Sequence, residues 1–221
     1  NKIFSKIFKI QNVFDYVISE EELNKFETIF NFSSELKVIK NQKYQRSDIE
    51  KEIGNFFKIK INKKKTNNSY MKIEKITLFP ISTSPIRIMP TKIINEIITN
   101  FSNKKKIEIV VDNFYATSKF INKNIQSHNN NVKLIFHNKL EELINIIKSI
   151  EYGIFVDSGP LHLAKIFNKS GLFIETSVNH KLLINNYDNF QVIKNSFKSK
   201  YCQGPCGLTN LFNFKNNTGC Y

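Results

Sequence analysis

Short apolar runs alternate with amphipathic segments along the second two-thirds of the chain. The runs are rich in Ile, Val, Leu and Phe, which suits strands buried on both faces of a parallel sheet. They lie at 75–80, 107–111, 132–136, 152–156 and 172–174. Helical segments are expected between them, at 91–100, 115–122, 140–150 and 161–167. Strands that alternate with helices in this way predict an α/β fold built on a parallel sheet.

A separate block precedes this pattern. Its expected elements are two strands and two helices, at 13–19, 36–39, 20–30 and 47–57. The block holds too few strands for a complete nucleotide-binding domain, so we expect 1–62 to be the C-terminal part of one. The polar stretch 63–69, KKKTNNS, predicts a linker. A second, Rossmann-like domain is then expected over 70–221.

The stretch YGIFVDSGPLHLAKIF, at 152–167, joins a predicted strand to a predicted helix through a tight turn. Ser158 or Gly159 can cap the helix, and Pro160 suits its first turn. Open parallel sheets bind ligands at such carboxyl ends of strands, where a helix N-terminus favours phosphate. Gly159 lets a ligand approach the backbone, and His162 could reach the same anion. The alternative is an ordinary strand–turn–helix with a capping Ser and a surface His.

A second candidate loop follows the strand at 75–80. Ser82, Thr83 and Ser84 offer hydroxyl groups, and Arg87 offers a cation. A guanidinium keeps its charge and presents a fork of donors to phosphate. The alternative is a solvent-exposed loop with an ordinary Arg.

Both stretches resemble motifs of one known family. DSGPLHLA resembles the D-S/T-G-x-x-H-L-A motif of the ADP-heptose:lipopolysaccharide heptosyltransferases, and PISTSPIRIMP is similar to their P-x-x-S-x-x-x-K-x-x-P segment. The order and separation of the two match the C-terminal half of such enzymes. The resemblance covers roughly the second domain, and the whole chain more loosely.

The resemblance implies a GT-B glycosyltransferase with two facing Rossmann-like domains. The second domain would bind a nucleotide-diphosphate sugar, and the enzyme would transfer the sugar, a heptose, to a lipopolysaccharide-type acceptor with inversion. Asp157 would contact sugar hydroxyls or fix the turn through backbone N–H groups, and Arg87 stands where the family commonly has Lys. The expected donor-binding residues are Ser82, Thr83, Ser84, Arg87, Asp157, Ser158, Gly159 and His162. The catalytic base would be an Asp in the first domain, upstream of this sequence, and no cofactor is implied.

The chain also departs from the family pattern. The family often has a ribose-binding acid after the strand at 107–111, where Asp112 is the only nearby acid and is interpreted as out of register. Glu175 follows the strand at 172–174, where the family tends to have Gly. His137 and Asn138 could border the base. The nucleotide therefore stays open, and His128 and His180 are interpreted as loop residues without a catalytic role.

The charge of the chain limits the kinds of binding partner that can be expected. Lys and Arg number 33 against 19 acidic residues, a net charge of +14, but the excess is spread along the chain and only 63–65 and 104–106 form clusters. With no nucleic-acid motif, contact with an anionic membrane surface is the more plausible result of this charge. No apolar run reaches the ~18 residues of a transmembrane helix, and no secretion signal is visible.

The three cysteines, Cys202, Cys206 and Cys220, lie together in the last twenty residues. An odd count without a secretion signal indicates a reducing compartment, and we expect a cytoplasmic protein at the inner membrane face. Structural zinc takes four ligands and only three cysteines are visible, so no metal is expected here; the alternative is a zinc site with a fourth ligand beyond Tyr221. Two other functions remain open: a non-catalytic nucleotide- or polyanion-binding α/β protein, and a GT-B transferase for another nucleotide sugar.

Overall fold

The computed structural model describes 72–114, 116–125, 129–184, 187–200 and 202–208, together with the backbone of two short paired strands, β7 (Phe212–Phe214) and β8 (Asn217–Gly219). The predicted block at 1–62 and linker at 63–69 lie outside these residues, as do His128 and Cys220.

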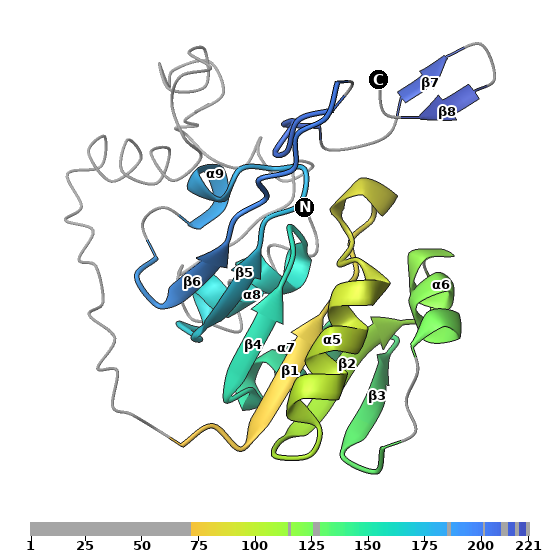
Figure 1. Cartoon of the computed structure of the whole chain (residues 1–221). Helices are drawn as coiled ribbons and strands as arrows, with labels where there is room; N and C mark the ends of the chain where they lie inside the picture. Colours follow the sequence, from red (N-terminus) through yellow and green to blue (C-terminus); the bar gives the residue numbers. More distant parts are fainter. Residues whose placement is uncertain are drawn as a thin grey trace, which may run out of the picture.

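Six parallel strands form the sheet of the described domain (Figure 1). They are β1 (Lys75–Phe79), β2 (Lys106–Asp112), β3 (Val132–His137), β4 (Tyr152–Phe155), β5 (Gly171–Ile174) and β6 (Phe190–Ile193). Their order across the sheet is β3-β2-β1-β4-β5-β6. This is the order of the Rossmann fold, in which two halves run outward from a central pair of strands. The predicted Rossmann-like α/β fold is confirmed for this domain.

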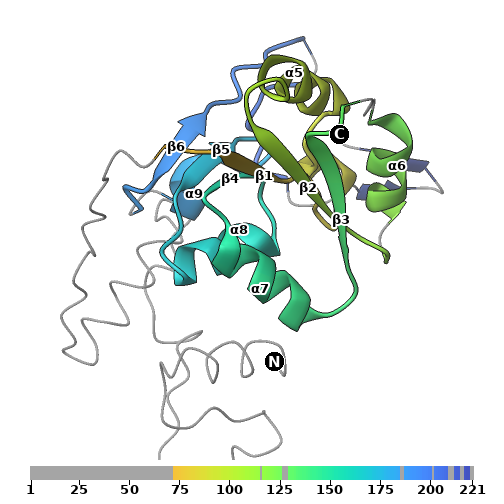
Figure 2. The same cartoon turned by 90° about the horizontal axis from the view of Figure 1, so that it is seen from below.

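Helices cover both faces of the sheet (Figure 2). Their bounds are η2 (Pro85–Arg87, a 3₁₀ turn), α5 (Thr91–Phe101), α6 (Ala116–Asn124), α7 (Leu140–Ser149), α8 (Gly159–Ile166) and α9 (His180–Ile184). One face carries α5 and α6, and the other carries α7 and α8. Each face has its own hydrophobic core, because alternate strand residues point to opposite sides: Ile109 packs on the α5 side and Val110 on the α7 side.

Most predicted elements are found, with ends displaced by one to a few residues. The helix predicted at 161–167 begins two residues earlier, at Gly159, because Ser158 takes the N-cap position and Pro160 fits the first turn. Five short elements in the described part of the chain were not predicted: η2, α9, β6, β7 and β8. The interpretation of His180 as a loop residue was wrong, since it is the first residue of α9.

The middle of the sheet is shaped by one buried aromatic ring and two glycines. Gly153 on β4 faces Gly171 on β5, and a Cβ on Gly153 would lie 2.2 Å from Phe155 Cζ. The fully buried Phe155 ring stacks on Phe79 with centroids 4.9 Å apart and meets the edge of Phe190 at 5.8 Å. The glycines therefore leave the room in which Phe155 ties β4 to β1, directly below the turn at Asp157.

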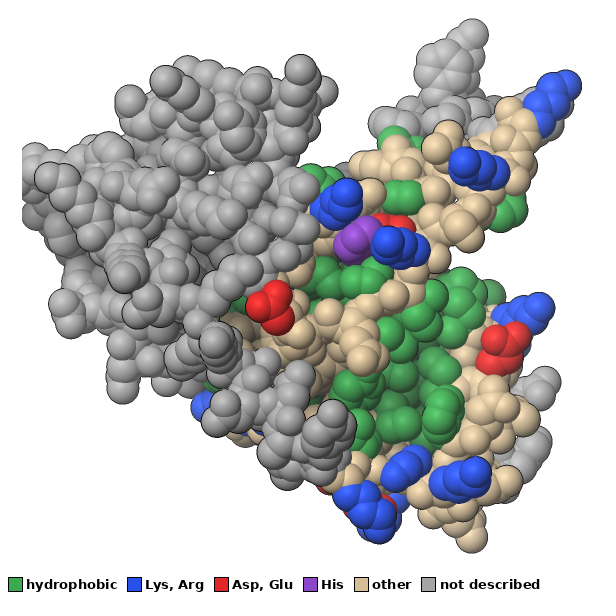
Figure 3. Space-filling view, turned by 60° about the vertical axis from the view of Figure 1, so that its left-hand side comes forward, with side chains coloured by type: hydrophobic (Ala, Val, Ile, Leu, Met, Phe, Trp, Pro, Cys, Tyr) green, Lys and Arg blue, Asp and Glu red, His purple; other side chains and the backbone are tan. Residues whose placement is uncertain are grey.

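Hydrophobic side chains also gather beside the β6 edge of the domain (Figure 3). A cavity of about 740 Å³ lies there, between η2 and the ends of β5 and β6, and Ile174, Ile193 and Cys202 are among its lining residues. Within the described ranges, no helix is long and apolar enough to cross a membrane.

Candidate functional site

The site lies where the sheet changes direction. From β1 the chain crosses through α5 to β2, and from β4 it crosses through α8 to β5 on the other side. Open parallel sheets bind ligands in the crevice outside the carboxyl ends of two such strands. A cavity of about 510 Å³ occupies this position. Its lining comes from the ends of β1, β2, β3 and β4, from the loops that follow these strands, and from the first turns of α7 and α8.

The cavity brings together seven of the eight predicted donor-binding residues. These are Ser82, Thr83, Arg87, Asp157, Ser158, Gly159 and His162. Ser84 is not among the lining residues: it is 1% exposed, and its hydroxyl has no hydrogen-bond partner among the described residues. The sequence could not separate Ser84 from its neighbours, because three adjacent hydroxyl residues in a loop give no periodicity.

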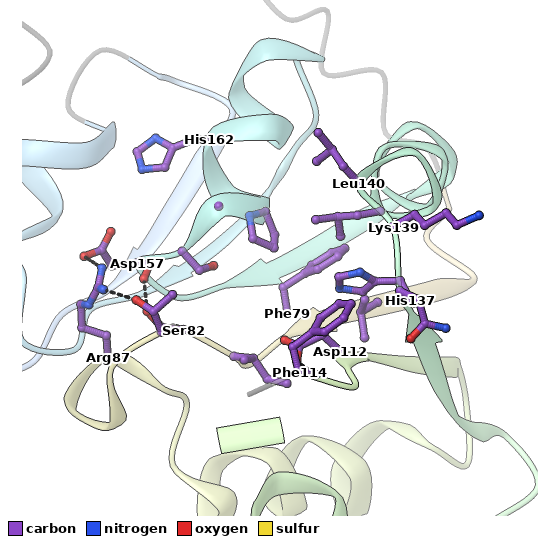
Figure 4. A pocket seen from close by; sticks show the side chains of 18 residues that line it. Phe79, Ser82, Arg87, Asp112, Phe114, His137, Lys139, Leu140, Asp157 and His162 are labelled. Carbon is purple, nitrogen blue, oxygen red and sulfur yellow. Dashed lines mark hydrogen bonds and ion pairs between the residues drawn. The ribbon is translucent and has the colours of Figure 1, made fainter. Parts of the chain in front are cut away.

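Arg87 is held in place by residues of two loops (Figure 4). Its Nη1 lies 3.1 Å from Asp157 Oδ2, and its Nη2 donates to Thr83 Oγ1 at 2.8 Å. The side chains of Arg87 and Asp157 are 18% and 6% exposed, so both charges are largely removed from water. Burying one of these charges alone would be costly, so the pair fixes the loop after β1 against the turn after β4.

This pairing differs from the expected role of Asp157. We expected its carboxylate to meet sugar hydroxyls or the turn's N–H groups, and the structure pairs it with Arg87. An anion that reached Arg87 would meet a guanidinium already neutralised in part by Asp157. The Arg87 Nε is buried and has no hydrogen-bond partner in the described part of the chain.

Ser82 and Ser158 have structural hydrogen bonds. The Ser82 hydroxyl donates to Asp157 O at 2.9 Å, and Ser82 O accepts the Thr117 hydroxyl at 3.2 Å. Ser158 is the N-cap residue of α8, but its hydroxyl donates to Val156 O at 3.2 Å and makes no cap bond. The start of α8 therefore has no side-chain cap. Pro160 has no N–H and the Leu161 N–H donates to Ser158 O at 3.2 Å, so an anion at this helix start would meet the Gly159 N–H and the positive end of the helix dipole.

Gly159 makes this helix start open. A Cβ built on Gly159 would meet no atom within 4 Å, and the residue is exposed. Its conformation does not require glycine, since its φ lies outside the left-handed region. The absence of a side chain here matters for what can approach α8 from the cavity, and not for the fold.

The opposite end of the cavity is apolar. Phe79, Val110, Leu140 and Leu143 line it, and Phe114 stands at its side. Phe79 and Val110 are at most 3% exposed, whereas Phe114 is 64% exposed. The cavity thus combines a charged and polar end with an apolar end, a combination typical of sites for small organic ligands.

Asp112 and His137 border the apolar end. Asp112, interpreted from the sequence as out of register, is the last residue of β2; it lines the cavity and is 7% exposed. Its Oδ1 accepts the Phe114 N–H at 2.8 Å. His137 lies beside it on β3, and burial lowers the pKa of His137 despite the nearby carboxylates of Asp112 and Glu142. Position at the carboxyl end of a strand was the signal that could have found Asp112.

Glu175 and His180 form a separate network at the end of β5. Glu175 Oε1 accepts from the backbone N–H of His180 at 2.7 Å and lies 2.7 Å from its Nδ1, while Oε2 accepts the Asn195 N–H at 2.9 Å. Burial by itself raises the pKa of Glu175, but these hydrogen bonds outweigh it and the pKa falls below its ordinary value. The network ties β5 to α9 and β6, and neither Glu175 nor His180 lines the candidate site.

The described cysteines lie elsewhere. Cys202 and Cys206 are free and exposed, and both line the second cavity beside η2. Among the described residues, no three His, Cys, Asp or Glu side chains are grouped closely enough to hold a metal ion.

Comparison with known proteins found similar structures but no similar sequences. No protein-family model and no curated protein matches the chain. The E. coli heptosyltransferase WaaC with ADP-2-deoxy-2-fluoro heptose is 14% identical, with a TM-score of 0.47 over 59% of this chain and 39% of that chain. The E. coli ADP-heptose lps heptosyltransferase II is 12% identical, with a TM-score of 0.48 over 66% of this chain and 42% of that one.

A third similar structure is the iron-containing dodecameric glycosyltransferase TibC from enterotoxigenic E. coli H10407, at 16% identity and a TM-score of 0.40 over 61% of this chain and 34% of that chain. The heptosyltransferases indicated by the two sequence motifs are therefore among the solved structures that this chain resembles. The similar region spans less than half of each of those proteins. Likeness at this level assigns no activity, substrate or site residue to the chain.

Proposed function

We propose that this chain is the donor-binding part of a glycosyltransferase that uses a nucleotide-diphosphate sugar. One observation carries the proposal. The Arg87 side chain and the start of α8 line one cavity at the switch point between β1 and β4, with an apolar compartment beside them. The helix begins at Gly159 and has no side-chain cap. A diphosphate suits the first part and a nucleobase suits the second.

The chemistry of sugar transfer needs both features of the polar end. When the bond between the sugar and the diphosphate breaks, negative charge grows on the leaving phosphate. Fixed donors aimed at that charge stabilise the transition state more than the ground state. The Gly159 N–H at the start of α8 would be such a donor, the Arg87 guanidinium would supply positive charge, and the His162 side chain in the first turn of α8 would supply a further donor.

Asp157 and Asp112 have different places in this proposal. Asp157 would act mainly by positioning Arg87, since its carboxylate is engaged there at 3.1 Å. Asp112, at the border of the apolar end, would accept a hydrogen bond from a ribose hydroxyl. A carboxylate has about four acceptor sites on its two oxygens, so it can accept a ribose hydroxyl in addition to the Phe114 N–H.

The finer activity belongs to the same proposal. The similar WaaC structures are described with ADP and with ADP-2-deoxy-2-fluoro heptose, so ADP is the first nucleotide to test here. Transfer of heptose to a lipopolysaccharide-type acceptor, with contact at an anionic membrane surface, follows from the motif resemblance. It would also need an acceptor site and a base that the residues above do not supply, and it invokes no cofactor.

Calorimetric titration of the whole chain with ADP and with inorganic pyrophosphate tests donor binding. We expect both to bind, and Gly159→Ala to weaken both at least about tenfold, because a methyl group would stand where phosphate approaches the helix. The melting temperature should stay unchanged, since the added Cβ meets nothing in the fold.

Lys123→Ala is the matched control, because Lys123 is an exposed cation in the last turn of α6, away from the cavity lining. Absence of binding by the folded protein would contradict the proposal. So would equal affinities of Gly159→Ala and Lys123→Ala for both ligands.

A further inference from the structure

Phe114 is an exposed aromatic ring held at the edge of the cavity. Single exposed hydrophobic residues are common on protein surfaces and need no explanation. Phe114 differs from Phe120 and Phe136, which are 52% and 47% exposed, because it lines the candidate site and they do not. Figure 4 shows its ring on the same side of the cavity as the rings of Phe79 and His137, away from Arg87 and Asp157.

Two hydrogen bonds hold the turn that carries this ring, one to its backbone and one between side chains. The Phe114 N–H donates to Asp112 Oδ1 at 2.8 Å, which closes a tight turn at the end of β2. The neighbouring Asn113 Nδ2 donates to Asn138 Oδ1 at 2.7 Å, which joins this turn to the one that follows β3. An exposed phenyl ring on a loop fixed in this way loses little freedom when a ligand covers it.

The surroundings of the ring define the shape of its ligand. Phe79 and Val110 close the floor, and Leu140 and Leu143 lie at the start of α7 on the other side. The half-buried His137 brings a second flat ring to the same region. A flat, largely apolar group with polar edges fits such a compartment, and the face of an aromatic ring favours a stacked heteroaromatic partner.

We propose that Phe114 is the stacking platform for the nucleobase of the donor, and so a positioning residue for the whole nucleotide. This inference rests on the proposed function, because the base is placed by a diphosphate bound at Arg87 and Gly159. Stacking reads no hydrogen-bond pattern, so the contact should strengthen binding of adenine and uracil nucleotides alike. Discrimination between bases would come from the polar groups at the rim of the compartment.

The test measures the affinity of the whole chain for ADP, UDP and inorganic pyrophosphate by calorimetry. Base–aromatic stacking is typically lost with an affinity change of about 5- to 150-fold on alanine substitution. We therefore expect Phe114→Ala to weaken ADP and UDP by a factor in this range and to leave pyrophosphate unchanged. Phe114→Tyr and Phe114→Trp should retain nucleotide affinity, and Phe114→Leu, which keeps apolar contact without a ring, should fall between them and alanine.

Phe120→Ala is the matched control, since it removes an exposed phenyl ring that does not line the cavity. The inference is overturned if Phe114→Ala binds ADP as tightly as the wild type while Gly159→Ala does not, and the proposed phosphate site then stands. An equal loss for ADP and pyrophosphate would also overturn it, because Phe114 would then only support the loop. Failure of the wild type to bind any of the three probes would refute the proposed function and the inference with it.

Discussion

The ion pair between Arg87 and Asp157 should contribute to stability as well as to the site. Replacing Arg87 by Leu removes the guanidinium and keeps apolar volume. The Asp157 carboxylate, which is 6% exposed beside Arg87, then lacks the cation that faces it at 3.1 Å. Removing one partner of a fully buried pair typically costs about 3–5 kcal/mol. Arg87 is 18% exposed and borders a cavity, so we expect the free energy of unfolding to fall by about 2–3 kcal/mol.

The reverse substitution should cost less. Asp157→Asn leaves Arg87 with Thr83 as a partner and with access to water in the cavity, so a loss of about 1–2 kcal/mol is expected. The double variant should be more stable than the sum of the two losses predicts, because no buried carboxylate is left unpaired. The expected coupling is about 1–2 kcal/mol.

Urea denaturation followed by far-ultraviolet circular dichroism measures these losses, since the chain contains no Trp for fluorescence. Lys123→Ala serves as the control for loss of an exposed positive charge and should change the free energy of unfolding by less than about 0.5 kcal/mol. If both single variants match this control and their effects add in the double variant, the pair does not hold the two loops together.

Three further predictions concern the fold around the site. Gly171→Ala should destabilise the domain by about 3 kcal/mol or more in urea denaturation, because its Cβ would lie 2.2 Å from Gly153 O; wild-type stability would refute this packing. Hydrogen bonds hold the pKa of Glu175 below its ordinary 4.5, so the ionised carboxylate stabilises the fold above pH 4.5. This stabilisation is lost as the pH falls through the lowered pKa, and the melting temperature of Glu175→Gln should therefore depend less on pH in the acid range than that of the wild type. Burial lowers the pKa of His137 below its ordinary 6.5, so the free energy of unfolding should decline as the pH falls below 6.5. If His137→Gln shows the same dependence of stability on pH as the wild type, this explanation is wrong.

The sequence alone determined the element types and most of the polar end of the site. Strand and helix periodicities depend on which local positions are buried, and the runs between 75 and 174 are long or regular enough to show this. The turn at Asp157, Ser158 and Gly159 is likewise a local feature, in which Ser, Gly and Pro set the start of α8. The missed elements, η2, α9, β6, β7 and β8, have three to five residues each, too few for a period to be visible.

The tertiary structure alone decided which of these local features meet. Arg87 and Asp157 are 70 positions apart and pair only because β1 and β4 are neighbours in the sheet. The same strand order brings Asp112 from β2 to the cavity and holds Phe114 beside it, while Ser84 turns into the interior next to the exposed Thr83. The sequence of a strand indicates which of its residues are buried, but it does not indicate which strand lies beside it. The order of the strands depends on packing across the whole sheet.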